Sequence, residues 1–377
     1  MGQAMDANAT LPGNWSLWDE DWGEEEEEDY HEHHVEALLN QTQPIRRSLT
    51  VVSMVAYAAI FVLGVPGNVA VLWVAGFLMA RRPVTVWYLN LSVADLLLCL
   101  TLPFLLTQLA MDFRWPFGPF LCKLLPWLTV LNMYASVFVL TGISVDRCLA
   151  ALLPLWSHRQ RSLGRARLSC ASAWGLALLM SLPSLLYRRT AQVAAEFPVR
   201  CIADYGEALG PRHRAISLAR FVFAFLLPLV VIAASNGLIA HRLRASRFSR
   251  PKSRRPCRLL LTVLLGFFLC WTPYHVVGLL FLSGDWRLQL WAQTVDPAAI
   301  SLAYLNSCLN PFLYAFAGRQ GQGQLRRGLK ELLEGAFEEE SSLASTRPKP
   351  MLPTVSEKTK APGLEPSGLV GPSLVTI

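Results

Sequence analysis

Residues Cys122–Cys148 read CKLLPWLTVLNMYASVFVLTGISVDRC, and this stretch decides the fold. It contains no charged residue between Lys123 and Asp146. Coiled as an α-helix, Cys122 to Arg147 would rise about 37 Å, which exceeds the roughly 30 Å hydrocarbon core of a bilayer. The stretch therefore predicts a membrane-spanning helix with a cysteine at one end and an Asp-Arg pair at the other.

Three polar side chains interrupt the middle of this helix. They belong to Asn132, Tyr134 and Ser136. Polar groups at the centre of a bilayer are costly when they face lipid, so they turn toward other protein segments. We therefore expect this helix to lie at the centre of a bundle, where it connects two sides of a membrane.

The composition extends this interpretation to the whole chain. The sequence is 53% hydrophobic and 16% charged, whereas soluble domains carry about 25% charged residues. The apolar residues gather in seven runs near or above the length that spans a bilayer. These runs are Leu49–Met79, Val86–Ala110, Phe120–Leu152, Ala166–Tyr187, Ala215–Ala240, Cys257–Leu282 and Val295–Phe316. We predict an all-α membrane protein, a seven-transmembrane helix bundle spanning residues 46–318.

The charges are distributed unevenly, although the net charge is only +7. Basic residues gather in alternate connections, at 81–82, 158–167, 242–258 and 319–330. The positive-inside rule places these connections in the cytoplasm, the N-terminus outside and the C-terminus inside. Arg46 and Arg47 run against this rule. The basic runs fit either topology alone or partner binding, and we expect no nucleic-acid partner.

Residues 1–45 form a polar, acidic segment that we predict to be disordered and extracellular. Glycosylation sequons begin at Asn8, Asn14 and Asn40, and Tyr30 follows an acidic run of the kind that favours tyrosine sulfation. The block Asp19–Glu36 would capture a basic protein ligand by electrostatic attraction. Its candidate contacts are Asp21, Glu24, Asp29 and Tyr30.

Several residues mark the interior of the bundle. Asn68 needs a partner there, and Asp95 is an intramembrane carboxylate and therefore a functional candidate. Pro103 and Pro273 should bend their helices. After the last span, residues 319–335 have leucines at helical spacing with basic residues between them, which predicts an amphipathic helix on the inner membrane lipid. Residues 336–377, rich in serine, threonine and proline, should be a disordered tail open to phosphorylation.

Together these motifs resemble the rhodopsin-like (class A) G-protein-coupled receptors over about residues 50–335. The matching residues are Asn68, the LSVAD stretch that ends at Asp95, Cys122, Asp146-Arg147, Trp174, Pro228, Cys270-Trp271-Thr272-Pro273 and Asn310–Tyr314. All of them occur in the family's order on seven spans. The sequence has no HExxH metal motif and no Gly-x-Ser-x-Gly stretch, so we expect a receptor and not an enzyme.

Finer features are similar to the leukocyte chemoattractant receptors. LNMYAS at 131–136, WPFG at 115–118 and FPVRCIADY at 197–205 look like this group, and best like receptors for the complement component 5a anaphylatoxin. Stretches such as SCLNP look closer to the second, weakly signalling type of that pair. Cys148 and Asn236 stand where most members have tyrosine. The alternatives are therefore a receptor that acts mainly through arrestin or scavenges its ligand, and a formyl peptide, chemerin, leukotriene or prostaglandin type of receptor.

The resemblance also implies roles for single residues. The shared outer location of Cys122 and Cys201 and the resemblance together predict a disulfide. Asp146, Arg147 and Tyr314 would contact an inhibitory-type heterotrimeric G protein or arrestin, with Asp146 holding Arg147 at rest. No cofactor is expected apart from an allosteric sodium ion. Its oxygen ligands would be Asp95, Asn132, Ser136, Asn306 and Asn310, which would alternatively form a structural hydrogen-bond network.

The expected ligand site lies near the outer end of the bundle. By resemblance, the C-terminal carboxylate of the ligand would meet Arg188 and Arg220, and its terminal arginine side chain would meet Asp296. Movement against Tyr274 and Trp271 would then tilt the sixth span at Pro273, with Asn310 also part of the switch. In the simpler alternative, Arg188 reaches the membrane interface and Asp296 caps a helix.

Overall fold

The computed structural model describes residues 24–192, 198–206, 209–245 and 255–319. Within these ranges, the side chains of 24–36, 158, 160, 243–245, 255–260 and 312–319 are not described. The predictions for Asn8, Asn14, Asp21, the amphipathic helix beyond residue 319 and the tail 336–377 lie outside the described residues. Glu24, Asp29, Tyr30 and Tyr314 belong to helices, but their side chains are not described.

The first span is longer than predicted. Helix α1 runs from Glu24 to Trp73 and continues as a π-helical turn, η1, at Val74–Leu78. Residues 24–45, for which the sequence predicts disorder, are therefore helical. Glutamate, alanine and leucine are good helix formers, and acidic residues near a helix N-terminus interact favourably with its dipole. Asn40 is exposed on this helix.

The second span is broken where its proline predicts. Helix α2 spans Pro83–Cys99 and helix α3 spans Leu102–Ala110. Pro103 has no backbone N–H, and its ring would clash with the carbonyl of residue 99 in a continuous helix. The break falls at residues 100–101, so the predicted kink is confirmed.

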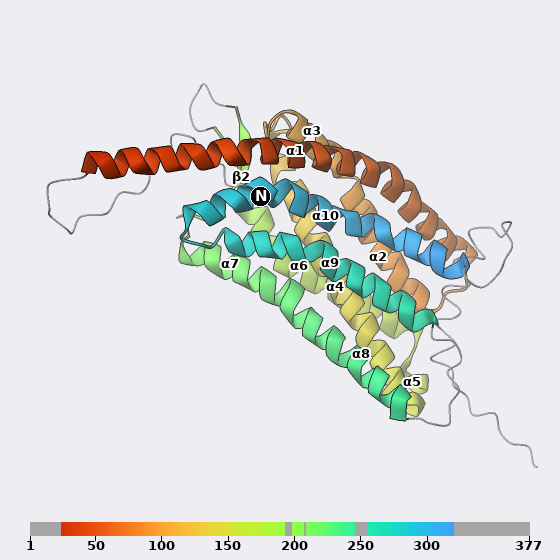
Figure 1. The fold of residues 1–377 in the computed structure, drawn as a ribbon. Coiled ribbons are helices and arrows are strands. Elements are labelled where there is room, and N and C mark those ends of the chain that lie inside the picture. The colour runs from red at the N-terminus through yellow and green to blue at the C-terminus, as the bar shows by residue number, and fades with distance from the viewer. Residues whose placement is uncertain (1–23, 193–197, 207–208, 246–254, 320–377) are drawn as a thin grey trace, which may run out of the picture. The chain divides into compact units, whose positions relative to one another are not determined.

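Helix α4, Gly118–Leu152, occupies the centre of the bundle, as the opening stretch predicts (Figure 1). It packs against α2, against α6 at Leu163–Leu186 and against α8 at Leu227–Ala245. Its apolar window is 72% buried, the largest share among the candidate spans in the described part of the chain. Asn132, Tyr134 and Ser136 are all buried. A short helix, α5 at Pro154–Gln160, follows α4.

The fifth span contains a second π-helical turn. Helix α7, Pro211–Phe221, is followed by η2 at Val222–Leu226 and then by α8. Pro228 cannot donate a backbone hydrogen bond to the turn before it, and a π-turn accommodates such a gap. Arg220 lies in the last turn of α7, immediately before this irregularity.

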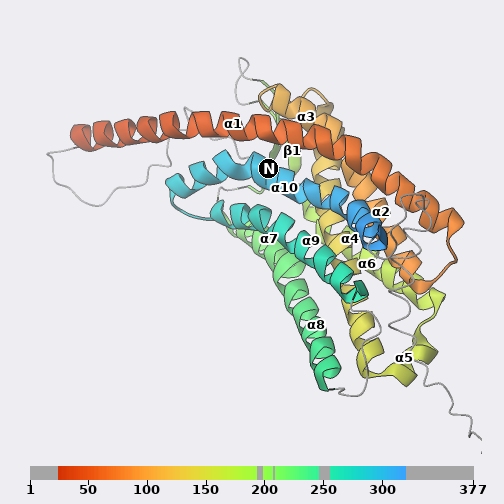
Figure 2. The same ribbon diagram turned by 45° about the vertical axis from the view of Figure 1, so that its right-hand side comes forward.

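The last two helices close the bundle. Helix α9 spans Arg255–Leu280, and α10 spans Trp286–Arg319 and packs against both α9 and α1 (Figures 1 and 2). Six helical stretches among the described residues are long and apolar enough to cross a membrane, and α10 packs beside them as the seventh helix. Asn68 on α1 donates to the backbone oxygens of Gly64 at 3.0 Å and of Ser307 on α10 at 2.9 Å. The predicted partner inside the bundle therefore exists.

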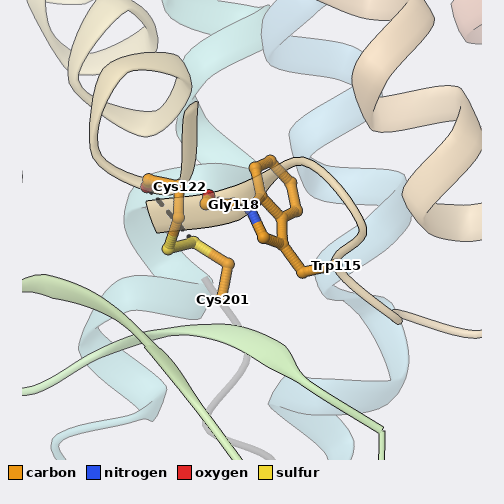
Figure 3. The surroundings of a disulfide bond; sticks show 4 residues. All are labelled: Trp115, Gly118, Cys122 and Cys201. Carbon is orange, nitrogen blue, oxygen red and sulfur yellow. Dashed lines mark hydrogen bonds between the residues drawn. A yellow bond between two sulfur atoms is a disulfide. The ribbon is translucent and has the colours of Figure 1, made fainter. Parts of the chain in front are cut away.

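A small hairpin, which the sequence analysis did not predict, covers one end of the bundle. Strand β1, Arg188–Ala191, pairs antiparallel with β2, Arg200–Ala203. The predicted disulfide joins Cys122 of α4 to Cys201 of β2 (Figure 3). Beside it, Trp115 Nε1 donates to the Gly118 carbonyl at 2.8 Å, and Gly118 has a φ of 74°. Hereafter, the disulfide end is the end of the bundle with this hairpin.

Candidate functional site

A cavity at the disulfide end brings together all four residues that the sequence analysis assigned to the ligand pocket. Arg188, Arg220, Tyr274 and Asp296 line one open space. They come from β1, α7, α9 and α10, which are far apart in sequence. We call this space the first cavity.

Two of the three charged residues that line the first cavity are buried. Arg188 is 5% exposed and Asp296 is 7% exposed. Among the described residues, no ion pair involves either of them. Arg220 Nη1 donates to the Tyr274 hydroxyl at 3.2 Å. Buried charges without a close partner are costly, so this cavity is suited to a ligand with charges of both signs.

The hairpin explains the position of Arg188. The sequence places this residue at the end of the fourth helix, but α6 ends at Leu186 and Arg188 opens β1 opposite Ala203. The adjacent Asp204 forms an ion pair with Arg189. A hydrogen bond from the Gly206 N–H, and to a smaller extent the charge of Arg189, lowers the pKa of Asp204 from its usual value. Burial lowers the pKa of Arg188 from its usual value. The alternative in which Arg188 reaches the membrane interface is wrong, because the side chain is buried in the cavity wall.

Asp296 also differs from its predicted position. The sequence places it at the outer end of the last span, but α10 begins at Trp286. The aspartate therefore lies within the helix and does not cap it. Pro297 follows it inside the helix, where the Ser301 hydroxyl donates to the Pro297 carbonyl at 2.8 Å. The carboxylate lines the cavity from the side of α10.

Sequence reasoning missed three polar aromatic residues of the same cavity, Tyr205, His213 and His275. The rings of Tyr205 and His213 stack with their centroids 5.1 Å apart. The His275 ring lies 4.9 Å from that of Phe225 in η2. His275 directly follows Tyr274, and Tyr205 ends the FPVRCIADY stretch that supports the resemblance, but no sequence signal pointed to His213.

A second, larger cavity adjoins the first. Arg188 and Asp296 line both spaces. Its other polar lining includes Arg46 of α1, Arg200 of β2 and Thr129 of α4. Two compartments therefore meet at one arginine and one aspartate.

The predicted switch begins at Tyr274, in the wall of the first cavity. The rings of Tyr274 and Trp271 are 5.5 Å apart and nearly perpendicular. Trp271 is fully buried and its ring lies 5.9 Å from that of Phe267. Pro273 lies inside α9, between Trp271 and Tyr274 in the sequence. A ligand that displaces Tyr274 therefore presses on a side chain of the packed core, but a motion at Pro273 stays a prediction.

Deeper in the bundle, the predicted sodium ligands include several buried polar atoms without a hydrogen-bond partner among the described residues. Asn310 Nδ2 donates to Asp95 Oδ2 at 2.8 Å. The other Asp95 oxygen, both amide atoms of Asn132 and the Ser136 hydroxyl have no partner there. Asn306 is also buried. Buried polar atoms are normally satisfied, and carboxylate, amide and hydroxyl oxygens suit a hard cation, so these residues fit the predicted ion.

At the opposite end of α4, Asp146 binds a residue that the sequence analysis did not name. Arg161, just after α5, donates to both carboxylate oxygens through its Nε and Nη2 atoms. This pair is about one quarter to one third exposed. The predicted grip of Asp146 on Arg147 and the contacts of Arg147 with a signalling partner stay predictions.

Comparison with known proteins places these features in a family. The family described as 7 transmembrane receptor (rhodopsin family) matches residues 67–314. A C3a anaphylatoxin chemotactic receptor of Danio rerio is 43% identical over 81% of this chain and 83% of the relative. The C5a anaphylatoxin chemotactic receptor 1 is 39% identical in Oryctolagus cuniculus, over 84% of this chain and 91% of the relative. The Homo sapiens receptor of that name is 37% identical over 86% and 93%.

Proposed function

Because this chain belongs to the rhodopsin family of seven-transmembrane receptors, we propose that it is a cell-surface receptor for the complement component 5a anaphylatoxin. The observation that carries the proposal is the first cavity, where buried Arg188 and Asp296 have no ion pair among the described residues. A peptide end with a carboxylate and a cationic side chain complements this lining.

The two arginines and the aspartate bind different groups of the ligand. Arg188 and Arg220 receive the C-terminal carboxylate of the ligand, because a guanidinium binds a carboxylate with paired N–H groups. Asp296 receives the side chain of a terminal arginine. Since these groups are desolvated in the cavity, each contact contributes more than a surface ion pair does.

Ligand binding is then converted into a change at the other end of the bundle. Pressure on Tyr274 passes to Trp271, which packs against it, and α9 tilts at Pro273. The polar cluster around Asp95 would hold a sodium ion, whose charge would favour the resting state. In the tilted state, Arg147 meets an inhibitory-type G protein or arrestin. The disulfide end and the N-terminus face the outside of the plasma membrane in this scheme.

A second candidate is a receptor that works through arrestin without activating a G protein. Asn236 lies eight residues after Pro228, at a position where signalling members have tyrosine. Its Nδ2 atom donates to the Ile232 carbonyl of its own helix at 2.9 Å. A short amide held in this way does not extend toward Arg147 as a tyrosine does, which favours weak G-protein coupling.

A second ligand is favoured by the relatives themselves. The Danio rerio and Oncorhynchus mykiss proteins, at 43% and 42% identity, carry the name of C3a anaphylatoxin receptors. The decisive experiment therefore measures binding of labelled C5a and labelled C3a to cells that express this chain. Saturable binding of C5a, displaced by unlabelled C5a, supports the proposal. Binding of C3a alone supports the second ligand, and binding of neither contradicts both.

Signalling is tested on the same cells with Arg147→Ala. We expect this variant to retain ligand binding and to lose any G-protein response, because the charged guanidinium is the contact with the partner. A wild type that recruits arrestin without a G-protein response supports the second candidate. A full G-protein response in the variant would mean that Arg147 only anchors the helix at the membrane.

A further inference from the structure

The second cavity has a strongly positive lining. Arg46, Arg188 and Arg200 contribute to it, against the single carboxylate of Asp296. The arginines come from three elements, α1, β1 and β2. Asp296 also lines the first cavity, where the proposed function assigns it to the terminal residue of the ligand. The second cavity therefore has an excess of guanidinium groups that the proposed function leaves unused.

Arg46 is held at this cavity by a contact that membrane topology does not explain. Its guanidinium carbon lies 5.1 Å from the centre of the Phe113 ring, within the range of a cation–π interaction. Phe113 has a φ of 62° and the preceding Asp112 a φ of 51°, a left-handed conformation that is strained for a bulky residue. The Phe113 N–H donates to the Gln108 carbonyl at 2.8 Å and helps to fix this turn. A strained turn thus presents the ring to Arg46.

Arg200 is fixed from the other side. It pairs with Ala191 across the hairpin, and the next residue, Cys201, is bonded to Cys122 of the central helix (Figure 3). The backbone at Arg200 is therefore tied both to the hairpin and to α4. The Phe113 ring thus contacts the Arg46 guanidinium, the disulfide fixes the backbone beside Arg200, and both arginines line the same cavity.

The remaining lining of the second cavity is mostly apolar, and its uncharged polar groups include the amides of Gln108 and Gln293 and the hydroxyls of Thr129 and Tyr304. Tyr57, Leu105, Phe113 and Ile300 supply apolar and aromatic surface. The hydroxyls of Thr129 and Tyr304 are hydrogen-bonded to each other at 2.6 Å. The second cavity therefore suits a ligand group that has an apolar body and a negative charge beside the arginines.

We infer that the second cavity is a subsite for an acidic side chain of the peptide ligand, upstream of its terminal arginine and flanked by apolar residues. This inference rests on the proposed function, because the first cavity must hold the terminal residue. The two cavities meet at Arg188 and Asp296, so a peptide that ends in the first cavity continues into the second. Arg46 and Arg200 then set the preference for the acidic residue.

The test uses short synthetic peptides that end in arginine with a free carboxylate and have apolar residues before it. Glutamate, glutamine or lysine is placed at each upstream position in turn, and binding to cells expressing the full chain is measured by competition. We expect one upstream position at which the glutamate peptide binds about tenfold more tightly than the lysine peptide. In Arg46→Glu and Arg200→Glu, that preference should shrink or reverse, with partial rescue of the lysine peptide.

Arg47→Glu is the matched control, because Arg47 is exposed on the same helix and does not line the cavity. It should leave the order of the peptides as in the wild type. Equal binding of the glutamate, glutamine and lysine peptides at every position would overturn this inference and leave the proposed function standing. A wild type that binds none of the arginine-ended peptides would overturn both. A reversal in Arg47→Glu as large as that in Arg46→Glu would also overturn it, since it would reflect surface charge alone.

Discussion

The charged groups of the first cavity and those at the opposite end of the central helix α4 are arranged in opposite ways. At the disulfide end, Arg188 and Asp296 are buried, and neither belongs to an ion pair among the described residues. At the other end, both oxygens of Asp146 accept hydrogen bonds from Arg161, and the pair is partly exposed. One end therefore keeps charges separated in a cavity, whereas the other end joins them.

The difference identifies which end awaits a ligand. A separated buried charge is costly, and a ligand of opposite charge recovers that cost on binding. A paired surface charge gains little from a new partner, because it must first give up the old one. We therefore assign recognition to the disulfide end and not to the paired charges at the opposite end. The following predictions test this assignment, beginning with the largest expected effect.

Removal of the disulfide is the first test of this assignment and has the largest expected effect. Cys122→Ser or Cys201→Ser frees β2 from α4, and with it the hairpin that positions Arg188 and Arg200. We expect binding of labelled anaphylatoxin at the cell surface to fall below detection. Cys170→Ser is the control, because Cys170 is a buried free cysteine of α6. Normal binding by either disulfide variant would show that the separated charges do not depend on the hairpin.

Removal of Asp296 tests the separated charges themselves. Loss of one partner of a desolvated charge pair costs about 2–5 kcal/mol, roughly a 30- to 5000-fold loss of affinity. Asp296→Ala should therefore bind an arginine-ended peptide and its des-Arg form almost equally, whereas the wild type prefers the former. Asp285→Ala serves as control, because this carboxylate accepts from the Arg287 N–H at 2.8 Å and does not line the cavity. A variant that still discriminates as well as wild type would mean that Asp296 does not receive the arginine.

The helices are predictable from the sequence because lipid imposes strict rules on it. Long apolar runs reveal the spans, and a mid-span polar residue such as Asn132 reveals an inward face. Pro103 likewise predicts the break between α2 and α3, because a proline without a backbone N–H cannot make the hydrogen bond of a continuous helix. The cost of a charge in lipid likewise assigns Asp95 and Arg220 to the interior of the bundle from the sequence alone.

The segments outside the lipid are not predictable in the same way. Water satisfies a backbone there in many conformations, so the hairpin that carries Arg188 leaves no periodic pattern. The apolar pattern puts the start of the last span at Val295, but packing against α9 and α1 continues the helix from Trp286. Tyr205 follows β2 and His213 lies at the start of α7, and no sequence pattern indicates that both line the cavity.

The acidic block offers a smaller test, because it acts before the ligand reaches the cavity. Deletion of residues 15–36 should slow association of the protein ligand about tenfold at low salt, since long-range attraction raises on-rates. The effect should vanish at high salt, where charges are screened. A block of equal length with glutamine in place of glutamate and aspartate is the control for length. Unchanged association rates and salt dependence would restrict recognition to the cavities.

The buried cluster between the two ends should produce a still smaller effect. If Asp95 and its neighbours hold sodium, the ion should weaken agonist binding to wild type about fivefold, a typical coupling between two sites. Asp95→Asn removes the charge and should abolish this sodium dependence. A large organic cation in place of sodium controls for ionic strength. Sodium dependence that survives in the variant would favour the purely structural hydrogen-bond network.

The smallest expected effect concerns the joined charges at the end opposite the disulfide. Arg161→Gln removes the guanidinium that binds both oxygens of Asp146. An ion pair this exposed contributes about 0.2–1 kcal/mol, so the response should change by no more than about fivefold. Without Arg161, we expect Asp146 to hold Arg147 more tightly at rest, and the agonist should activate the G protein with lower potency.

Arg159→Gln is the matched control, because Arg159 is exposed on α5, close in sequence to Arg161, whereas the hydrogen bonds to Asp146 come from Arg161. G-protein activation and ligand binding are measured together in both variants, so that a change in coupling is separated from a change in affinity. A higher basal response in Arg161→Gln would reverse the interpretation, since the Arg161 pair itself would then be the resting contact. A loss of ligand affinity in that variant would instead show that the two ends of α4 are coupled at rest, because neither Asp146 nor Arg161 lines either cavity.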